Sequence, residues 1–343
     1  MEILNYTNSF FVIFTLISYF LIFNKRKNIA EFLGIIDIPN LERNTHKRPV
    51  PKTAILSLMV TLVLLLIFNL ILNLFESDLN IIILGSVSIF LLGLIDDKFK
   101  LPAYKKLFLS FLIIFLTISF SENLIIKKFY LETYDTFFPL NNFSIIFTTF
   151  CIILVINALN LSDGINGLAI GIVFFQLLFF ISKNYNLSYS IVIPIVLINL
   201  LITFFHTYKE RHFLGDSGSL MLPTLVAYLF IYNMNIGIAK EALVVSAEKA
   251  FILFMLPGLD MLRLFIERIF KKKDPFDGDK NHLHHYLIKK NSLKKTLLIY
   301  FLMMNIPVML TWNLNFKSSY VIVLSIFSYI LIIAYLKRTS PKI

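Results

Sequence analysis

Side chains suited to chemistry gather at Asn157, Asn160 and Asp163, between two long apolar runs at 143–156 and 168–181. Each of the three lies three residues from the next, so at a helix end they share one face. Polar groups at membrane depth are costly and usually face protein or water. The break therefore predicts a polar site that other parts of the chain complete. The simpler alternative is that Asp163 caps the next helix.

Two further clusters carry carboxylates. Asp96 and Asp97 follow an apolar run, and Mg²⁺ binds such oxygens while keeping substrate phosphates as further ligands. A solvated helix end is the alternative for this pair. The run from Gly215 to Ser219 is typical of a tight loop before a helix, where backbone N–H groups hold a phosphate and Asp216 holds its metal. Here the alternative is a helix cap with turn glycines.

Three of the six histidines, His282, His284 and His285, lie within four residues of one another after a basic run. Zinc is disfavoured, because two adjacent ligands give awkward tetrahedral geometry and no cysteine lies nearby. Hydrogen bonding to phosphates is expected instead, with Lys280 and Arg268 close in sequence. A solvated basic loop is the other interpretation.

An earlier basic loop runs from Asp37 to Pro51 and contains Arg43 and His46. It could contact an anionic substrate. It could equally serve only as a positively charged anchor at the membrane surface.

The composition sets the class of protein. Of 343 residues, 57% are hydrophobic and 36 are phenylalanine, while 15% are charged against roughly 25% in soluble domains. This indicates an all-α polytopic membrane protein. The single cysteine, Cys151, excludes an intramolecular disulfide. The net charge of +11 is confined to a few loops, so nucleic acid is not an expected partner.

Runs long enough to cross about 30 Å of hydrocarbon predict about eleven transmembrane helices, with ten as the alternative count. They are 8–23, 54–75, 79–95, 107–121, 143–160, 165–182, 187–205, 218–235, 242–262, 295–313 and 319–336. We interpret residues 1–343 as a single integral membrane domain. Its expected cytoplasmic loops are 24–53, 96–106, 157–167, 206–219 and 263–294. The outer segment 122–142 is expected to form a small hairpin or a surface segment.

The distribution of lysine and arginine predicts the orientation. Of the 32 basic residues, 26 fall on one side of the expected spans, which places the N-terminus outside and the C-terminus in the cytoplasm. Every polar cluster then lies on the cytoplasmic face, where we expect the active site. Transporter sites lie near the bilayer midplane instead, so the pattern favours phosphate chemistry at the membrane interface.

The motifs occur together in an order that resembles a known family. The matching patterns are Ile95-Asp96-Asp97 with Lys106-Leu107, Asn157-x-x-Asn160-x-x-Asp163-Gly164-x-x-Gly167, Gly215-Asp216-x-Gly218-Ser219 and His282-x-His284-His285. They are similar to those of the polyprenyl-phosphate N-acetylhexosamine-1-phosphate transferases of glycosyltransferase family 4, over about residues 34–286. The loops at 37–51 and 279–285 resemble the undecaprenyl-phosphate GlcNAc-1-phosphate transferase branch.

The resemblance implies transfer of N-acetylhexosamine-1-phosphate, first of all GlcNAc-1-phosphate, from a UDP-sugar to undecaprenyl phosphate. The products would be undecaprenyl-diphospho-sugar and UMP. The lipid product would initiate a cell-envelope polysaccharide, such as an O-antigen of lipopolysaccharide, at the bacterial inner membrane. Alternatives are a UDP-6-deoxy-N-acetylhexosamine or phospho-MurNAc-pentapeptide donor, or a polytopic transporter. A homodimer, and a covalent aspartyl intermediate, both remain open.

The resemblance also implies roles for particular residues. Catalytic roles fall to Asp96, Asp97, Asp163 and Asp216, with Asp216 and Asp163 as ligands of Mg²⁺ or, alternatively, Mn²⁺. Substrate-binding roles fall to Asn157, Asn160, Lys106, Gly215, His282, His284, His285, Asp279, Arg268 and His46. Two positions depart from the family pattern, which usually has a second acid where this chain has Asn166 and a glutamine where it has Ser110.

Overall fold

The apolar runs fold as helices, because in lipid a backbone must satisfy its own hydrogen bonds within the segment. The computed structural model describes residues 2–39, 48–182, 191–239, 245–275 and 280–339. Within them the helices are α1 (Glu2–Asn24), α2 (Arg26–Leu33), α3 (Leu56–Leu72), α4 (Ser77–Phe99), α5 (Ala103–Ser119), α6 (Ser144–Leu161), α7 (Leu168–Ser182), α8 (Val192–Tyr208), α9 (Gly215–Ala239), α10 (Ala247–Phe270), α11 (Leu283–Lys290), α12 (Leu293–Trp312) and α13 (Ser318–Thr339). The short strands are β1 (Ile36–Asp37), β2 (Val50–Pro51), β3 (Lys128–Leu131) and β4 (Thr136–Pro139), and 3₁₀ turns lie at Glu122–Leu124 and Asn141–Phe143.

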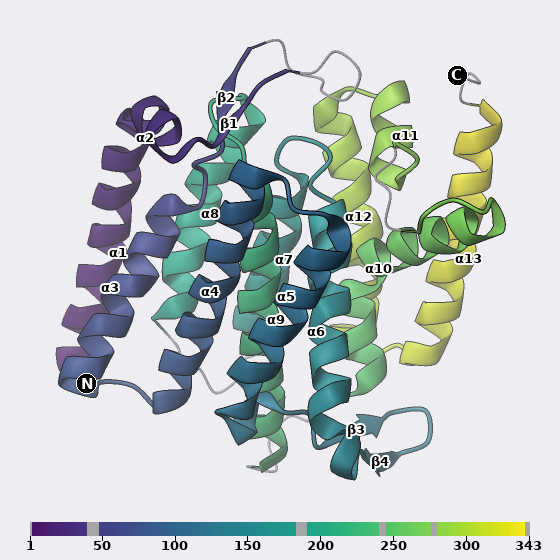
Figure 1. The fold of residues 1–343 in the computed structure, drawn as a ribbon. Coiled ribbons are helices and arrows are strands. Elements are labelled where there is room, and N and C mark those ends of the chain that lie inside the picture. Colours follow the sequence, from purple (N-terminus) through teal and green to yellow (C-terminus); the bar gives the residue numbers. More distant parts are fainter. Residues whose placement is uncertain (1, 40–47, 183–190, 240–244, 276–279, 340–343) are drawn as a thin grey trace.

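Each of the eleven expected spans contains a helix, so the prediction of an all-α, multi-pass membrane protein is confirmed. By length and composition, five helices among the described residues are long and apolar enough to cross a membrane: α4, α6 with its preceding turn, α9, α12 and α13. The pair α1–α2, bent by 73°, makes a sixth if it is one span. Three shorter apolar helices, α3, α7 and α8, lie in the same bundle (Figure 1).

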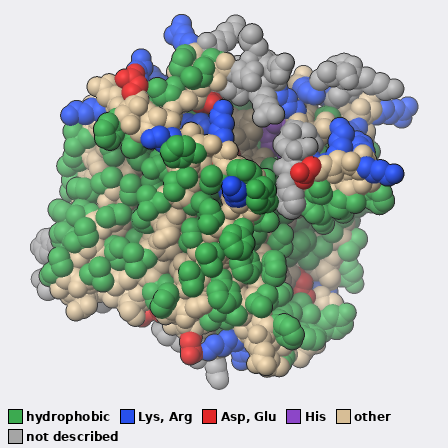
Figure 2. All heavy atoms as spheres, in the orientation of Figure 1, with side chains coloured by type: hydrophobic (Ala, Val, Ile, Leu, Met, Phe, Trp, Pro, Cys, Tyr) green, Lys and Arg blue, Asp and Glu red, His purple; other side chains and the backbone are tan. Residues whose placement is uncertain are grey.

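Helix α9 forms the centre of the bundle (Figure 1). Most of its residues are buried, and it packs along α4, α6 and α7. The side chains on the outer face are largely hydrophobic across the middle of the molecule, while lysine and arginine gather toward the upper edge (Figure 2). That edge is also hollowed, and histidine side chains are visible inside the hollow (Figure 2).

The two ends of the bundle carry different small elements (Figure 1). Strands β3 and β4 form an antiparallel hairpin at the lower end, with Phe129 opposite Phe138, which agrees with the expected hairpin in 122–142. Glu248, at the start of α10, holds this hairpin by accepting hydrogen bonds from the backbone N–H groups of Glu132 and Thr133. The paired strands β1 and β2 lie at the upper end with α2 and α11 (Figure 1).

Several of the expected loops are shorter than predicted. Helix α4 continues through the two acids to Phe99, whereas we expected a loop from 96 to 106. The helix tolerates Asp96 near its C-terminal end because the backbone N–H of Leu101 donates to Asp96 Oδ1 at 2.7 Å and Lys106 neutralises the charge. The expected loops 157–167, 206–219 and 263–294 likewise include the ends of α6, α8 and α10, and all of α11.

Candidate functional site

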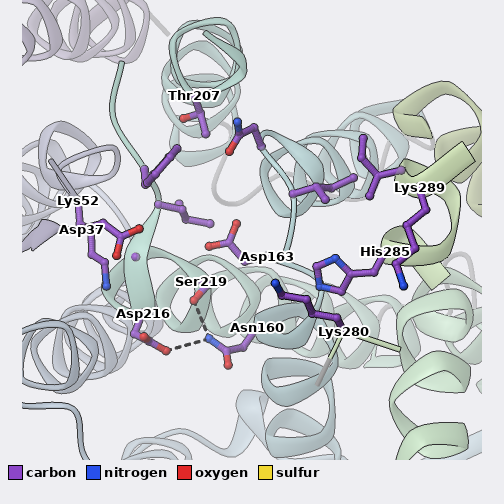
Figure 3. Close-up of a pocket in the computed structure, with 17 residues that line it drawn as sticks. Asp37, Lys52, Asn160, Asp163, Thr207, Asp216, Ser219, Lys280, His285 and Lys289 are labelled. Atoms are coloured by element: carbon purple, nitrogen blue, oxygen red, sulfur yellow. Dashed lines mark hydrogen bonds between the residues drawn. The ribbon is translucent and has the colours of Figure 1, made fainter. Parts of the chain in front are cut away.

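A cavity of about 490 Å³ opens at the upper end of the bundle, where the N-terminus of α9 meets the connection between α6 and α7 (Figure 3). Helix α11 closes its far side. The cavity is lined by Asp37, Lys52, Asn160, Asp163, Gly164, Ile165, Asn166, Thr207, Phe213, Leu214, Gly215, Asp216, Ser219, Lys280, His285, Ile288 and Lys289. Carboxylates lie toward one side, while Lys280, His285 and Lys289 lie toward the other (Figure 3).

Asp216 stands in the first turn of α9 and is held by two neighbouring helices. Lys106 Nζ, from α5, donates to Asp216 Oδ1 at 2.9 Å and to Asp96 Oδ2 at 2.8 Å. Asn160 Nδ2, from α6, donates to the same Oδ1 at 3.2 Å and to Ser219 Oγ at 2.6 Å. The Oδ2 atom of Asp216 has no partner among the described residues. One carboxylate oxygen is therefore fixed and the other is available to a ligand.

Asp97 caps the N-terminus of α9. Its two carboxylate oxygens accept hydrogen bonds from the backbone N–H groups of Asp216 and Ser217, at 2.9 and 3.0 Å. A carboxylate at this end of a helix is favoured by the unpaired N–H groups and the helix dipole. Gly215 permits the close approach, since its φ is +68° and a Cβ there would lie 2.6 Å from Asp97 Oδ2. Asp97 thus sets the position of Asp216 without lining the cavity itself.

Lys52 completes this charge cluster from the first basic loop. Its Nζ donates to Asp97 Oδ1 at 3.0 Å. Burial lowers the pKa of Lys52, but the carboxylates of Asp97, Asp216 and Asp37 together outweigh it and the net pKa is raised, so the amine stays charged. The β1–β2 pairing brings Asp37 to the same wall, and Phe213 N–H donates to Pro51 O at 2.9 Å, which ties this loop to the start of α9.

Asp163 lies on the cavity wall between α6 and α7. No hydrogen bond or ion pair to its carboxylate is found among the described residues. Burial, together with the negative charges of Asp216 and Asp97, holds the pKa of Asp163 well above its usual range. An added cation would reverse that effect by favouring the ionised form. As far as the structure describes the chain, Asp163 is therefore a carboxylate without a paired cation.

The three histidines do not share one environment. His285 lines the cavity, and burial, with the nearby His282 and Lys280, lowers its pKa to about 4. It is therefore neutral at pH 7 and can donate or accept a hydrogen bond. His282 and His284 are buried behind it, and the Nε2 atom of His284 has no hydrogen-bond partner within the described part of the chain. That atom faces Gly164, where a Cβ would lie only 2.2 Å away.

The structure brings some predicted residues to the cavity and leaves others elsewhere. Asn160, Asp163, Gly215, Asp216 and His285 line it. Asp96, Asp97 and Lys106 stand directly behind Asp216, whereas Asn157 donates to the Ile153 carbonyl of its own helix and Arg268 donates to the carbonyl of Pro275. His46 and Asp279 lie outside the described residues.

Several cavity residues escaped the sequence analysis as individual candidates, among them Lys52, Thr207, Ser219 and Lys289. A larger omission is Asp260 in α10. It is 4% exposed and accepts hydrogen bonds from Arg263, Tyr329 and His282. The available signal was an aspartate near the end of the expected span 242–262, because an acid in such a position is a functional candidate by default.

The comparison with known families bears on the helices that carry this cavity. A family model described as glycosyl transferase family 4 matches residues 79–234, which run from α4 through α9 and include Asp96, Asp97, Asn160, Asp163 and Asp216. Over this segment the chain is similar to glycosyl transferase family 4. The family resemblance inferred from the motifs is thereby confirmed.

Individual relatives resemble the chain over most of its length. A Bacillus subtilis protein named probable undecaprenyl-phosphate N-acetylglucosaminyl 1-phosphate transferase is 27% identical over 266 residues, covering 76% of this chain and 72% of its own. An undecaprenyl-phosphate alpha-N-acetylglucosaminyl 1-phosphate transferase of Thermotoga maritima is 29% identical, covering 83% of each chain. A phospho-N-acetylmuramoyl-pentapeptide-transferase of Dictyoglomus turgidum is also 29% identical, covering 92% of this chain and 100% of its own.

The carboxylate oxygens in this cavity are donor atoms that suit hard cations. Among the described residues, no three His, Cys, Asp or Glu side chains lie close enough to hold a metal ion together. Among the described carboxylates, Asp163 and Asp216 could supply oxygen ligands in the cavity, and further oxygens would come from water or substrate. That arrangement is typical of Mg²⁺, which is usually bound by one or two carboxylates plus substrate phosphates.

Proposed function

We propose that this protein transfers N-acetylhexosamine-1-phosphate from a UDP-sugar to undecaprenyl phosphate, releasing UMP. GlcNAc-1-phosphate is the first candidate for the transferred group, because the Bacillus and Thermotoga relatives are named for it. The observation that carries the proposal is one cavity, at the lysine-rich end of a membrane bundle, in which Asp163 and Asp216 face Lys280, His285 and Lys289.

The reaction exchanges one phosphorus–oxygen bond for another. An oxygen of the lipid phosphate attacks the sugar-bearing phosphorus of the donor, and the bond from that phosphorus to the oxygen of UMP breaks. Both reactants are anions, so alignment and charge neutralisation supply most of the catalysis. Lys280 and Lys289 would neutralise phosphate charge, and neutral His285 would donate a hydrogen bond to a phosphate or sugar oxygen.

We propose that Asp216 and Asp163 hold Mg²⁺, with Mn²⁺ as the alternative ion. The Asp163 carboxylate, which has no partner in the described structure, and the available Oδ2 of Asp216 support this assignment. When bound, the ion would neutralise charge on the diphosphate. Asp97 acts by fixing the helix that carries Asp216, and Asp96 acts by holding Lys106.

Removing the divalent cation is expected to stop transfer. Treatment with EDTA should reduce turnover to background, and excess Mg²⁺ should restore it. In Asp163→Asn, the Mg²⁺ concentration needed for half-maximal activity should rise about tenfold, because one anionic ligand is lost. The measurement is a Mg²⁺ titration of the initial rate. Full turnover in EDTA would remove the metal from the mechanism.

We propose further that the cavity end faces the cytoplasm of a bacterium, with the N-terminus outside and the C-terminus inside. The support is that lysine and arginine side chains gather toward that end on the visible face (Figure 2), as expected for the cytoplasmic side of an inner-membrane protein. UDP-sugars would then reach the cavity from the cytoplasm. The lipid product would initiate a cell-envelope polysaccharide.

A radiolabel assay tests the proposed reaction. Purified protein would be mixed with undecaprenyl phosphate, Mg²⁺ and labelled UDP-GlcNAc, and label entering the lipid phase would be counted. We expect transfer that requires both substrates and releases one UMP for each lipid product. If folded protein transfers label from none of a panel of UDP-N-acetylhexosamines, the enzymatic proposal fails and a transporter becomes the better hypothesis.

The second candidate donor is UDP-MurNAc-pentapeptide, from which phospho-MurNAc-pentapeptide would be transferred. It is favoured by the Dictyoglomus relative, whose whole length the chain covers. The same assay with this donor separates the two proposals. Transfer from UDP-MurNAc-pentapeptide alone would keep the reaction type and change the product.

A further inference from the structure

Asp260 is the most heavily bonded carboxylate in the part of the chain that the structure describes. Its Oδ1 accepts from Arg263 Nη2 at 2.9 Å and from the Tyr329 hydroxyl at 2.7 Å. Its Oδ2 lies 2.9 Å from His282 Nδ1, and the backbone N–H of Leu283 reaches both oxygens at 3.1 Å. Burying a charge is costly unless it is paired, and here four donors contact the two carboxylate oxygens.

These bonds fix the start of α11. His282 is the residue before the first turn of this helix, and Leu283 is its first residue. Asp260 therefore caps α11 from a neighbouring helix and at the same time sets the ring orientation of His282. A carboxylate that receives the Nδ1–H of a histidine fixes both its tautomer and its ring plane.

A series of ring contacts connects His282 to the cavity. The rings of His282 and His284 are stacked, with centroids 5.4 Å apart and planes inclined by 11°. The rings of His284 and His285 lie 4.3 Å apart, and His285 lines the cavity. On the other side, His284 abuts Gly164, next to Asp163. The stack thus joins Asp260 to both walls of the site.

Two further contacts bring the C-terminal helix into this arrangement. Tyr329, in α13, bonds to Asp260 and also receives a hydrogen bond from Arg263 Nε at 2.8 Å. Glu267 links Arg263 to Lys337 near the end of α13. The family model matches residues 79–234, and that segment contains none of residues 260, 263, 282 and 329.

We propose that Asp260 is a positioning residue for the reaction. Through His282 and His284 it holds His285 on the cavity wall and sets the spacing between α11 and the Asp163–Gly164 turn. Arg263 and Tyr329 keep the charge of Asp260 paired. Because Tyr329 lies in α13, this helix is also required to position His285. This inference rests on the proposed function, because its kinetic test uses donor transfer.

The kinetic test compares two acid-to-amide variants in the same helix. Asp260→Asn is expected to lower kcat/KM for the UDP-sugar by about 10- to 100-fold, the range found for residues that orient a ligating histidine. The KM for undecaprenyl phosphate should change less than twofold. Glu248→Gln, at the opposite end of α10 and bonded to the hairpin, should retain wild-type kinetics. Asp260→Asn with unchanged kcat/KM would overturn the proposal.

A second readout does not depend on the reaction. In a Cys151→Ser background, Ile288→Cys places a thiol on the α11 wall of the cavity, and its labelling rate with a maleimide reports the packing of α11. Adding Asp260→Asn should raise that rate at least fivefold. If labelling responds while the wild-type protein transfers no donor, the proposed function fails and the positioning role stands. Unchanged labelling would overturn the positioning role itself.

A milder variant keeps the test decisive if Asp260→Asn does not fold in detergent. Tyr329→Phe removes one hydrogen bond from Asp260 and preserves the ring and the carboxylate. It should lower kcat/KM for the donor two- to threefold and raise maleimide labelling in the same direction. Wild-type values for both quantities would contradict the proposal.

Discussion

Replacing Asp216 by asparagine is expected to lower the rate of transfer by about a thousandfold or more, a loss comparable to removing a principal electrostatic group from an active site. Asp216 is placed at the N-terminus of α9, its Oδ1 is fixed by Lys106 and Asn160, and it lines the cavity. Asparagine keeps the shape and one oxygen. It removes the negative charge that would hold Mg²⁺ and leaves Lys106 with one carboxylate partner. The measurement is kcat in the radiolabel assay at saturating substrates and Mg²⁺.

The control for this loss is Asp135→Asn. Asp135 lies in the exposed hairpin at the opposite end, where Tyr130 donates to its carboxylate at 2.6 Å. The same change of acid to amide should leave kcat within about twofold there, since surface pairs contribute little. Both variants should elute as the wild-type protein does in gel filtration. Normal turnover by folded Asp216→Asn would remove this residue from the mechanism.

Much of the fold follows from the apolar runs, because only helices and closed barrels satisfy backbone hydrogen bonds in lipid. Each expected span contains a helix. The ends were less predictable, as at Asp96 and Asp97. Adjacent acids near a helix C-terminus are unfavourable in isolation. Besides the local N–H of Leu101, the tertiary partners Lys106, Lys52 and the N-terminus of α9 offset that cost.

The site was predictable where polar residues interrupt apolar runs, as at Asn160, Asp163 and Asp216. The sequence pattern could not show which of several similar side chains lines the cavity and which one caps a helix. Asp97 caps a helix while Asp216 faces the cavity, although both are aspartates in motifs. Asp260 escaped notice because its partners come from α10, α11 and α13, and no spacing along the chain joins residues 260, 282 and 329.

A single methyl group at Gly164 is expected to lower transfer about a hundredfold. In Gly164→Ala the added Cβ would lie 2.2 Å from His284 Nε2 and 3.0 Å from His285 Nε2. His284 cannot turn away freely, because it is 1% exposed and stacked on His282. The histidine stack or the Asp163 turn must therefore shift, and a displacement of about 1 Å can cost this much in rate. The measurement is kcat/KM for the donor.

Gly258→Ala is the matched control, since a Cβ at this position in α10 meets nothing within 4 Å. It should keep wild-type kinetics and stabilise the helix by about 0.5–1 kcal/mol. A double-mutant cycle then identifies the cause of the loss in Gly164→Ala. His284→Ala creates room for the methyl group, so adding Gly164→Ala to it should cost less than twofold. If Gly164→Ala is just as damaging without the His284 ring, the loss comes from the backbone of the turn and the histidine contact is not its cause.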